Sequence, residues 1–191
     1  MAETRSTMLP LGTVMPSFTL PDAVSGRTLT SQDVRGTKGT LVMFLCNHCP
    51  FVQHVLPELQ RLDHDYAKKG LGIVAINSND LVAFQEDDPP HMKELAQQQG
   101  WSFPFLMDET QDVARAYNAA CTPDFFLFDS ENALAYRGRL DDTRPKTDAK
   151  PHGRDLRAAL DEVVAGRAPT GEQFPSVGCN IKWKESPVPR T

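Results

Sequence analysis

The chain has 191 residues, of which 40% are apolar and 24% charged, and its formal net charge is −5. This size and composition suit one globular domain with elaborations better than two domains. The acidic balance argues against a nucleic-acid footprint, and no apolar run is long enough to cross a bilayer, so neither nucleic acid nor a membrane is an expected partner.

We expect residues 1–14 to form a flexible leader. They contain no continuous hydrophobic region followed by a small-residue cleavage site, so we expect no signal peptide and a cytoplasmic location. Structural disulfides are rare in that compartment. The four cysteines of the chain therefore indicate redox or metal chemistry.

The main domain, expected over residues 15–167, begins with a β-hairpin formed by short strands at 15–20 and 27–29. Residues 40–45 form a continuous apolar run, which is typical of a central strand buried on both faces. A second strand of this kind is predicted over residues 71–76. With a helix between them, the two form a strand–helix–strand unit whose strands pair in parallel.

The helix between these strands is predicted over residues 51–66. Pro50 suits its first turn, Gly70 ends it, and Pro57 inside it predicts a kink. The apolar residues that recur at helical spacing are Val52, Val55, Leu56, Leu59, Leu62 and Tyr66.

After residue 76 the chain turns polar and then carries an acidic, proline-bearing insert over 85–90, which we interpret as a solvated loop. The further predicted elements are a helix at 91–99, a strand at 103–107, a helix at 110–117, an antiparallel strand pair at 125–128 and 133–137, and a helix at 154–164. Residues 168–191 form a proline-punctuated tail with an apolar patch, so we expect the tail to fold back onto the domain.

The motif Cys46-Asn47-His48-Cys49-Pro50 lies where the central strand ends and the helix begins. A helix start stabilises a thiolate through the helix dipole and free backbone N–H groups, and the thiolate is the species that attacks a disulfide. We expect Cys46 to lie at an exposed rim as the nucleophile, and Cys49, one turn further in, to resolve the mixed disulfide. A pair of ordinary buried cysteines is the alternative.

His48 lies between the two cysteines of the motif. As an imidazolium it would stabilise the thiolate and make the disulfide a stronger oxidant. A solvated histidine with a weak field effect is the open alternative.

Thr122-Pro123 precedes the strand predicted over 125–128. In the predicted arrangement of strands and helices, the loop that contains Thr122 and Pro123 lies opposite the CxxC. A cis proline in that loop would expose backbone for a substrate chain to pair with. Cys121 should therefore lie near the dithiol, either as a redox thiol or as a small buried filler.

Cys179 lies in the apolar patch of the tail, within the sequence SVGCNIKW at 176–183. If the tail folds back, Cys179 approaches Cys121 or the CxxC and acts as an additional redox thiol.

Metal binding is the rival chemistry for the cysteine motif. The candidate ligands are Cys46, Cys49, His48 and His54. No second CxxC or HxxxH stands at the spacing of a structural zinc site, and Pro50 after an apolar strand fits redox chemistry better. We therefore predict neither a metal nor a cofactor.

With these motifs the chain resembles the thioredoxin superfamily, and more narrowly the peroxiredoxin-like redoxins grouped with alkyl hydroperoxide reductase and thiol-specific antioxidant proteins, in the subgroup that carries a CxxC. The resemblance covers about residues 15–183. The segments that carry it are FLCNHCPFV at 44–52, VAINSND at 74–80, CTPDFFLFD at 121–129, GRLDD at 138–142 and VGCNIKW at 177–183.

The resemblance implies an α/β, thioredoxin-like fold: a central mixed β-sheet flanked by helices, with an N-terminal β-hairpin and a helical insert. It also implies reversible dithiol chemistry and a cis proline at Pro123. One departure from thioredoxin proper is that the strand before the CxxC carries no buried acid.

The first functional hypothesis is a thiol–disulfide oxidoreductase that uses Cys46 and Cys49, with His48, Pro50, Thr122 and Pro123 in support. Its partners would be protein or small-molecule disulfides and a thiol electron donor. The second is a thiol peroxidase in which Cys49 reacts with peroxide and another thiol condenses with it. The third is a non-enzymatic binding module that senses redox state.

Overall fold

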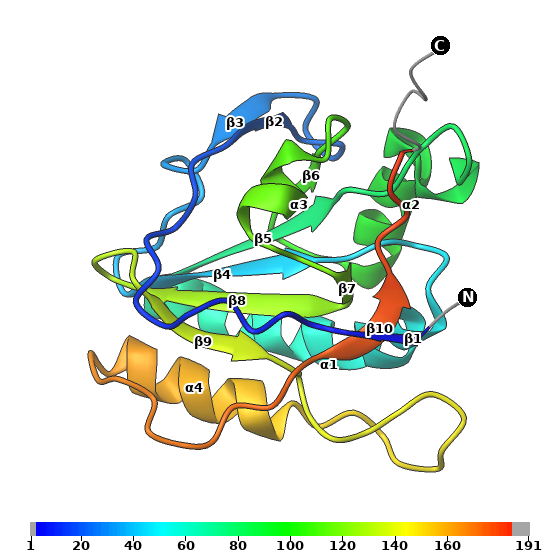
Figure 1. The fold of residues 1–191 in the computed structure, drawn as a ribbon. Coiled ribbons are helices and arrows are strands. Elements are labelled where there is room, and N and C mark those ends of the chain that lie inside the picture. The colour runs from blue at the N-terminus through cyan, green and yellow to red at the C-terminus, as the bar shows by residue number, and fades with distance from the viewer. Residues whose placement is uncertain (1–2, 185–191) are drawn as a thin grey trace, which may run out of the picture.

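The computed structural model describes residues 3–184, and its centre is a five-stranded mixed sheet in the order β6-β5-β4-β8-β9 (Figure 1). The strands are β4 (Gly39–Phe44), β5 (Leu71–Asn77), β6 (Phe105–Met107), β8 (Asp124–Asp129) and β9 (Leu134–Gly138). The first three pair in parallel, and β8 and β9 pair antiparallel. The mixed central sheet expected from the sequence is present.

Helices cover both faces of this sheet. The helices α1 (Pro50–Tyr66), α2 (Pro89–Gln99) and α4 (Arg154–Val164) contribute to one apolar cluster, and α3 (Asp112–Ala116) contributes to the other. Figure 1 shows α1 and α4 on the side of the sheet opposite α3. Two short 3₁₀ turns, η1 (Ala67–Lys69) and η2 (Gln85–Asp87), follow α1 and precede α2. None of the helices that the structure describes has the length and apolar content to span a membrane.

The alternation of side chains along β4 explains its central place. Leu41 and Met43 lie in the cluster with α1, whereas Val42 and Phe44 lie in the cluster with α3. Successive side chains of a strand point to opposite faces, so a strand buried on both faces needs an apolar residue at every position. The uninterrupted apolar run of the sequence satisfies that need.

The N-terminal hairpin is shorter than we expected. It consists of β2 (Thr19–Pro21) and β3 (Thr28–Thr30), which pair antiparallel. Met15 and Phe18 precede it and are buried without forming a strand, since their side chains pack against the face of the sheet that α3 covers. Burial, rather than strand pairing, accounts for their apolar character.

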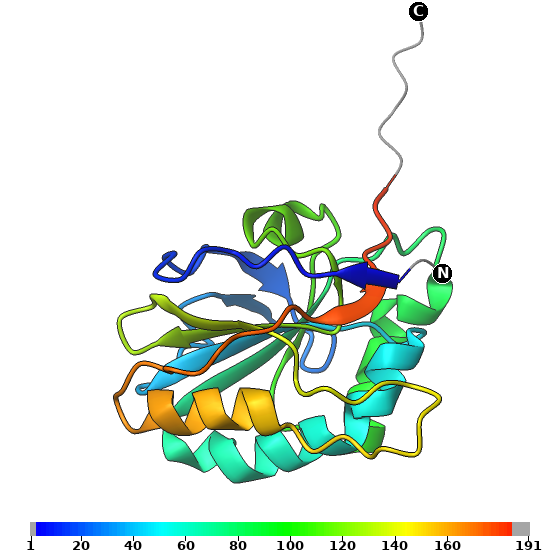
Figure 2. The same cartoon turned by 60° about the horizontal axis from the view of Figure 1, so that its bottom comes forward.

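A second, three-stranded sheet joins segments from both ends of the chain. Its order is β1 (Glu3–Arg5), β10 (Val177–Asn180) and β7 (Cys121–Thr122), all antiparallel. Figures 1 and 2 both show the first and last strands of the chain side by side at the end of the central sheet where α1 begins. Residues 177–180 of the tail therefore lie on the domain; residues 185–191 of the tail lie outside the described residues.

The leader predicted over residues 1–14 contacts the domain along the part that the structure describes, and its flexibility stays a prediction. Besides the pairing of β1, the backbone N–H of Ser6 donates to the carbonyl of Ser176, and Arg137 donates to the carbonyl of Leu9. The polar composition of the leader hid this role, because an edge strand contributes backbone hydrogen bonds whatever its side chains are. Residues 1–2 lie outside the described residues.

Candidate functional site

The CxxC segment connects the end of β4 to the start of α1. Cys49 is the N-cap residue of α1, and Pro50 is its first helical residue, as the sequence predicted. At that position Pro50 loses nothing by lacking an N–H group, and its fixed φ angle suits the helix. Cys49 therefore lies closer to the positive end of the helix dipole than Cys46 does.

Cys46 does not lie at an exposed rim, as we had expected. Its exposed fraction is 0%, and its Sγ lies 3.2 Å from the hydroxyl oxygen of Thr122. The pKa of Cys46 is raised well above its ordinary value, first because its thiol donates to Cys49, then because it is buried, and then because the Asp87 carboxylate is near. The raised pKa favours the protonated form of Cys46, in contrast to the prediction that Cys46 is the ionised nucleophile.

The pKa of Cys49 moves in the opposite direction to that of Cys46. The Cys46 thiol is the largest cause of its lowered pKa, about 5; burial opposes this effect, and the Cys179 thiol adds to it. The backbone N–H of Val52, in the first turn of α1, lowers the pKa further. A lowered pKa favours the anionic form, which is the form in which a sulfur attacks a disulfide.

Cys179, on β10, lies against Cys49. Their two Sγ atoms are 2.6 Å apart, although the residues are 130 positions apart in the sequence. Burial, the hydrogen bond with Cys49 and the charge of Cys49 raise the pKa of Cys179 to about 12. The sequence analysis left open whether Cys179 approaches Cys121 or the CxxC, and in the structure Cys179 lies at the CxxC.

Cys121 is buried on β7, but its thiol faces the carbonyl oxygen of Pro123 at 3.8 Å. Burial raises the pKa of Cys121 far above its ordinary value. Its position near the dithiol agrees with the sequence analysis. A thiol that is held protonated and aimed at a carbonyl fits the reading of Cys121 as a small buried filler.

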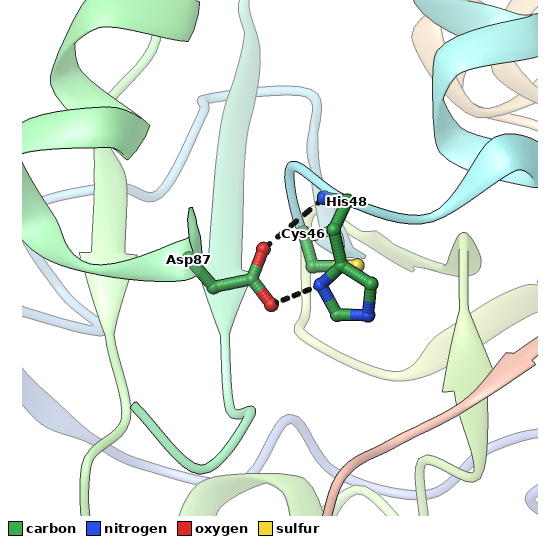
Figure 3. A group of neighbouring side chains, drawn as sticks. All are labelled: Cys46, His48 and Asp87. Atoms are coloured by element: carbon green, nitrogen blue, oxygen red, sulfur yellow. Dashed lines mark hydrogen bonds and ion pairs between the residues drawn. The ribbon is translucent and has the colours of Figure 1, made fainter. Parts of the chain in front are cut away.

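His48 uses its ring to bind Asp87 (Figure 3). Its Nδ1 lies 2.6 Å from a carboxylate oxygen of Asp87, and its ring stacks on Phe84 with 5.0 Å between the ring centroids. The hydrogen bond with Asp87 is the largest cause of the raised pKa of His48. Its other ring nitrogen, Nε2, is buried without a hydrogen-bond partner among the described residues.

Asp87 is the site residue that the sequence analysis missed. We interpreted the insert at 85–90 as a solvated loop, yet the Asp87 side chain is fully buried and accepts hydrogen bonds from the backbone N–H groups of Asn47 and His48 and from the Asn79 amide. Burial, the largest single effect, raises its pKa, but the hydrogen bonds from His48, Asn79 and the Asn47 backbone, together with the charge of His48, outweigh burial and lower it. A buried carboxylate with this many donors anchors the CxxC loop.

The Thr122–Pro123 peptide bond is cis, as the resemblance implies. The expected open groove beside it is not free, because Thr122 pairs with Cys179 of β10. The chain's own tail therefore covers the backbone that we assigned to a substrate chain. Ser176 also donates to the carbonyl of Pro123 at 2.8 Å.

Asp124 is a second buried acid that the sequence did not single out. It follows Pro123 at the start of β8, pairs in register with Phe44, and is fully buried with one carboxylate oxygen lacking a partner among the described residues. Burial raises its pKa well above the ordinary value. The buried acid that the strand before the CxxC lacks is thus supplied by the neighbouring strand.

The rival metal ligands are not brought together as the sequence suggested. His54 lies one turn into α1 and contacts the Thr143 hydroxyl at 2.9 Å, so it does not join the cysteines. Ligand atoms of Cys46, His48 and Asp87 do lie within 4.8 Å of one another. In this group the Cys46 thiol is protonated and the His48 ring is already bonded to Asp87, which favours a hydrogen-bonded anchor over a metal site.

Three findings relate the chain to known proteins. A model of the AhpC/TSA family matches residues 11–137. The structure of an uncharacterized conserved protein from Geobacillus kaustophilus is 49% identical, covers 97% of this chain and 98% of its own, and has a TM-score of 0.95. The thiol-disulfide oxidoreductase ResA of Geobacillus thermodenitrificans is 28% identical over 149 residues, 78% of this chain and 79% of its own length.

The fold expectation is confirmed by a more distant structure. A thioredoxin-like protein in its oxidized form is 22% identical, covers 83% of this chain and 99% of its own, and has a TM-score of 0.65. The fold is therefore thioredoxin-like, with the three-stranded sheet β1-β10-β7 beside the central one.

Proposed function

This chain belongs to the AhpC/TSA family, and we propose that it acts as a thiol–disulfide oxidoreductase in which Cys49 is the sulfur that forms and breaks disulfides. The observation that carries this proposal is the place of Cys49: it caps the N-terminus of α1, with the Cys46 thiol as its proton donor. A CxxC in this position is suited to disulfide exchange. The oxidoreductase ResA, 28% identical to the chain, supports the same chemistry.

The roles of the two CxxC cysteines follow from their protonation. Cys49, as the thiolate, attacks a sulfur of the substrate disulfide and expels the other sulfur as a thiolate, which takes up a proton from solvent. Cys46 then gives up its proton and attacks Cys49, which forms the Cys46–Cys49 disulfide and releases the reduced substrate. A thiol donor restores the dithiol by the reverse exchange. Substrates are therefore protein or small-molecule thiols and disulfides.

A disulfide-bonded model peptide with a fluorescence readout tests this function. We expect Cys49→Ser to lower the exchange rate by more than about 100-fold, because the reacting sulfur is gone. Cys121→Ser is the matched control, since it removes a buried thiol that contacts a carbonyl rather than another sulfur. Exchange by Cys49→Ser at the native rate would overturn the proposal.

A second function is favoured by the same thiolate. A cysteine that is ionised at neutral pH can attack hydrogen peroxide, which converts its sulfur to sulfenic acid and releases water once the leaving oxygen takes up protons. Condensation with a second thiol then forms a disulfide and releases another water molecule. If the protein is a thiol peroxidase, Cys49→Ser abolishes peroxide consumption in the presence of a thiol donor. A native protein that exchanges disulfides but consumes no peroxide would reject this second function.

A further inference from the structure

The C-terminal strand β10 occupies the place beside the cis proline where we expected a substrate chain. Cys179 pairs antiparallel with Thr122, the residue just before Pro123, and projects its sulfur onto Cys49. Figure 1 shows β10 between β1 and β7, at the end of the central sheet where α1 begins. Cys179 therefore stands toward Cys49 as a substrate cysteine would.

Contacts on both sides of Cys179 hold β10 in this register. Before it, the hydroxyl of Ser176 donates to the carbonyl of Pro123 at 2.8 Å. After it, the backbone N–H of Lys182 donates to the side chain of Asn79 at 2.9 Å. The separation of 2.6 Å between the Cys49 and Cys179 sulfurs is only about 0.6 Å longer than a disulfide bond. The two sulfurs are therefore in direct contact, as the partners of a disulfide must be.

Cys179 is also more exposed to solvent than Cys46 and Cys49. The exposed fraction is 0% for Cys46 and Cys49 and 3% for Cys179. Cys179 also lines a surface pocket of about 460 Å³, together with Arg144 and Lys146. Of the three cysteines in this cluster, Cys179 is the one that a molecule in that pocket can approach.

We propose that Cys49 has two disulfide partners, Cys46 and Cys179, and that Cys179 is the cysteine that meets the substrate. This inference rests on the proposed thiol–disulfide exchange and assigns its entry point. The charged residues of the pocket give the substrate class: Arg144 and Lys146 outnumber the one acid, Glu3, and this balance favours a small thiol or disulfide that carries carboxylate groups.

Exchange with the substrate begins at the Cys179 sulfur. A substrate thiolate attacks the Cys179 sulfur of a Cys49–Cys179 disulfide, which forms a Cys179–substrate bond and expels Cys49 as a thiolate. A second substrate thiolate attacks the substrate sulfur of that mixed disulfide, which releases the substrate disulfide and Cys179, and Cys179 takes up a proton. Cys49 is a good leaving group because it is stable as an anion.

Cys46 stores the disulfide out of reach of solvent. When the Cys46 thiol loses its proton and attacks Cys49 of the Cys49–Cys179 disulfide, a Cys46–Cys49 bond replaces it and Cys179 leaves and is protonated. No net oxidation occurs in this step. The reverse step returns the disulfide to Cys179, and a substrate disulfide reoxidises the reduced protein by the reverse of the first exchange.

Oxidation of full-length Cys46→Ser by glutathione disulfide, followed by acid quenching and peptide mass mapping, tests the pairing. We expect a Cys49–Cys179 disulfide as the main product. When this oxidised variant is given reduced glutathione and quenched, we expect glutathione on Cys179 in at least about tenfold excess over Cys49. Glutathione found only on Cys49, with no Cys49–Cys179 peptide, would overturn the inference.

The native protein and a second variant keep the test decisive even if Cys46→Ser folds poorly. Oxidised native protein should contain both disulfides, whereas Cys179→Ser should contain only Cys46–Cys49 and exchange with glutathione about tenfold more slowly. If Cys179→Ser exchanges at the native rate, β10 moves aside and the substrate reaches Cys49 directly; the inference then fails while the proposed function stands. If native protein forms no disulfide at Cys49, both fail.

The substrate class has its own test with a matched control. Arg144→Gln and Lys146→Gln should each slow the reaction with glutathione about 3- to 10-fold, and raising the salt concentration should shrink the difference. Lys38→Gln removes the same charge next to the opposite end of β4 and should leave the rate at the native value. Equal effects of Lys38→Gln and Lys146→Gln would show that the pocket does not select for carboxylates.

Discussion

The carboxylate of Asp87 accepts hydrogen bonds from both the backbone N–H of His48, at 3.2 Å, and the ring Nδ1 of His48, at 2.6 Å. A residue of a loop 39 positions away thus fixes the middle of the CxxC segment from two directions. The same negative charge raises the pKa values of His48 and of Cys46. Asp87 therefore links the conformation of the loop to the protonation of its sulfur.

We expect Asp87→Asn to lower the pKa of Cys46 and of His48, because the negative charge that raises both is lost. The rate of Cys46 alkylation against pH, read by mass spectrometry, and the NMR titration of His48 measure the two changes. Glu86→Gln, which removes an exposed charge one residue earlier, is the control and should change both pKa values less. Unchanged titrations in Asp87→Asn would show that Asp87 acts on the loop conformation alone.

The contribution of this pair to stability should depend on pH. The raised pKa of His48 gives a contribution that is complete below the ordinary imidazole value of 6.5 and is lost as the pH rises through the folded value. The lowered pKa of Asp87 gives a contribution to stability that is complete above the ordinary value of 3.8 and is lost as the pH falls through the folded value. The difference in unfolding free energy between native protein and Asp87→Asn should therefore be largest between these two values in urea titrations.

The stability of the reduced protein should rise with pH through ionisation of Cys49. A thiol whose pKa falls from its ordinary 9.0 to about 5 on folding stabilises the protein fully above 9.0, and this contribution is lost as the pH falls toward 5. Urea unfolding of native protein and Cys49→Ser at pH 5, 6, 7 and 8 isolates the contribution of Cys49 ionisation to the free energy of unfolding. The gap between the two proteins should widen at each step, and a constant gap would show that Cys49 is not ionised in the folded protein.

The pairing of β10 with β7 should depend on Gly178. A Cβ at this position would lie 2.0 Å from the backbone carbonyl oxygen of Thr122, which cannot be accommodated without moving the strand. We expect Gly178→Ala to lower the free energy of unfolding by about 1–3 kcal/mol in urea titrations. Gly171→Ala, in the same tail with nothing within 4 Å of its Cβ position, should change it by less than about 0.5 kcal/mol.

The helix that carries Cys49 should depend on Glu58 for its attachment to α4. Glu58 is 1% exposed and its carboxylate is bonded to Arg157 of α4 and, at 2.6 Å, to Arg61 of α1. Glu58→Gln leaves two guanidinium groups without their shared anion, so we expect a loss of about 3 kcal/mol in unfolding free energy. Glu162→Gln breaks an exposed pair with Arg167 and should cost less than about 1 kcal/mol. Equal losses would show that burial does not distinguish the two pairs.

The features that sequence patterns predicted are local ones. The continuous apolar run of β4 and the helical spacing of α1 are read from neighbouring residues, because each element's period matches the face that it buries. The helix expected over 154–164 is α4 (Arg154–Val164). The CxxC at a strand–helix junction, and with it the redox chemistry, followed from the same local signals.

The errors in the sequence analysis have a common cause. Asp87 looked like a solvated acid because its donors come from a loop 39 residues earlier, and residues 3–5 looked like a loose leader because their partner strand starts at Val177. No periodicity within a segment records which distant backbone it pairs with. Periodicity also does not record which cysteine of the CxxC has the lower pKa, because these pKa values depend on burial, on Asp87 and on the contact with Cys179.

The amino-acid sequence by itself determined that this protein has a CxxC motif at the start of a helix on a buried sheet, since side-chain periodicity and turn chemistry act over a few residues. Only the tertiary structure decided in which direction the pKa of each sulfur moves and which cysteine faces Cys49. Those outcomes depend on desolvation and on contacts between residues up to 130 positions apart, and both arise only when the chain has folded.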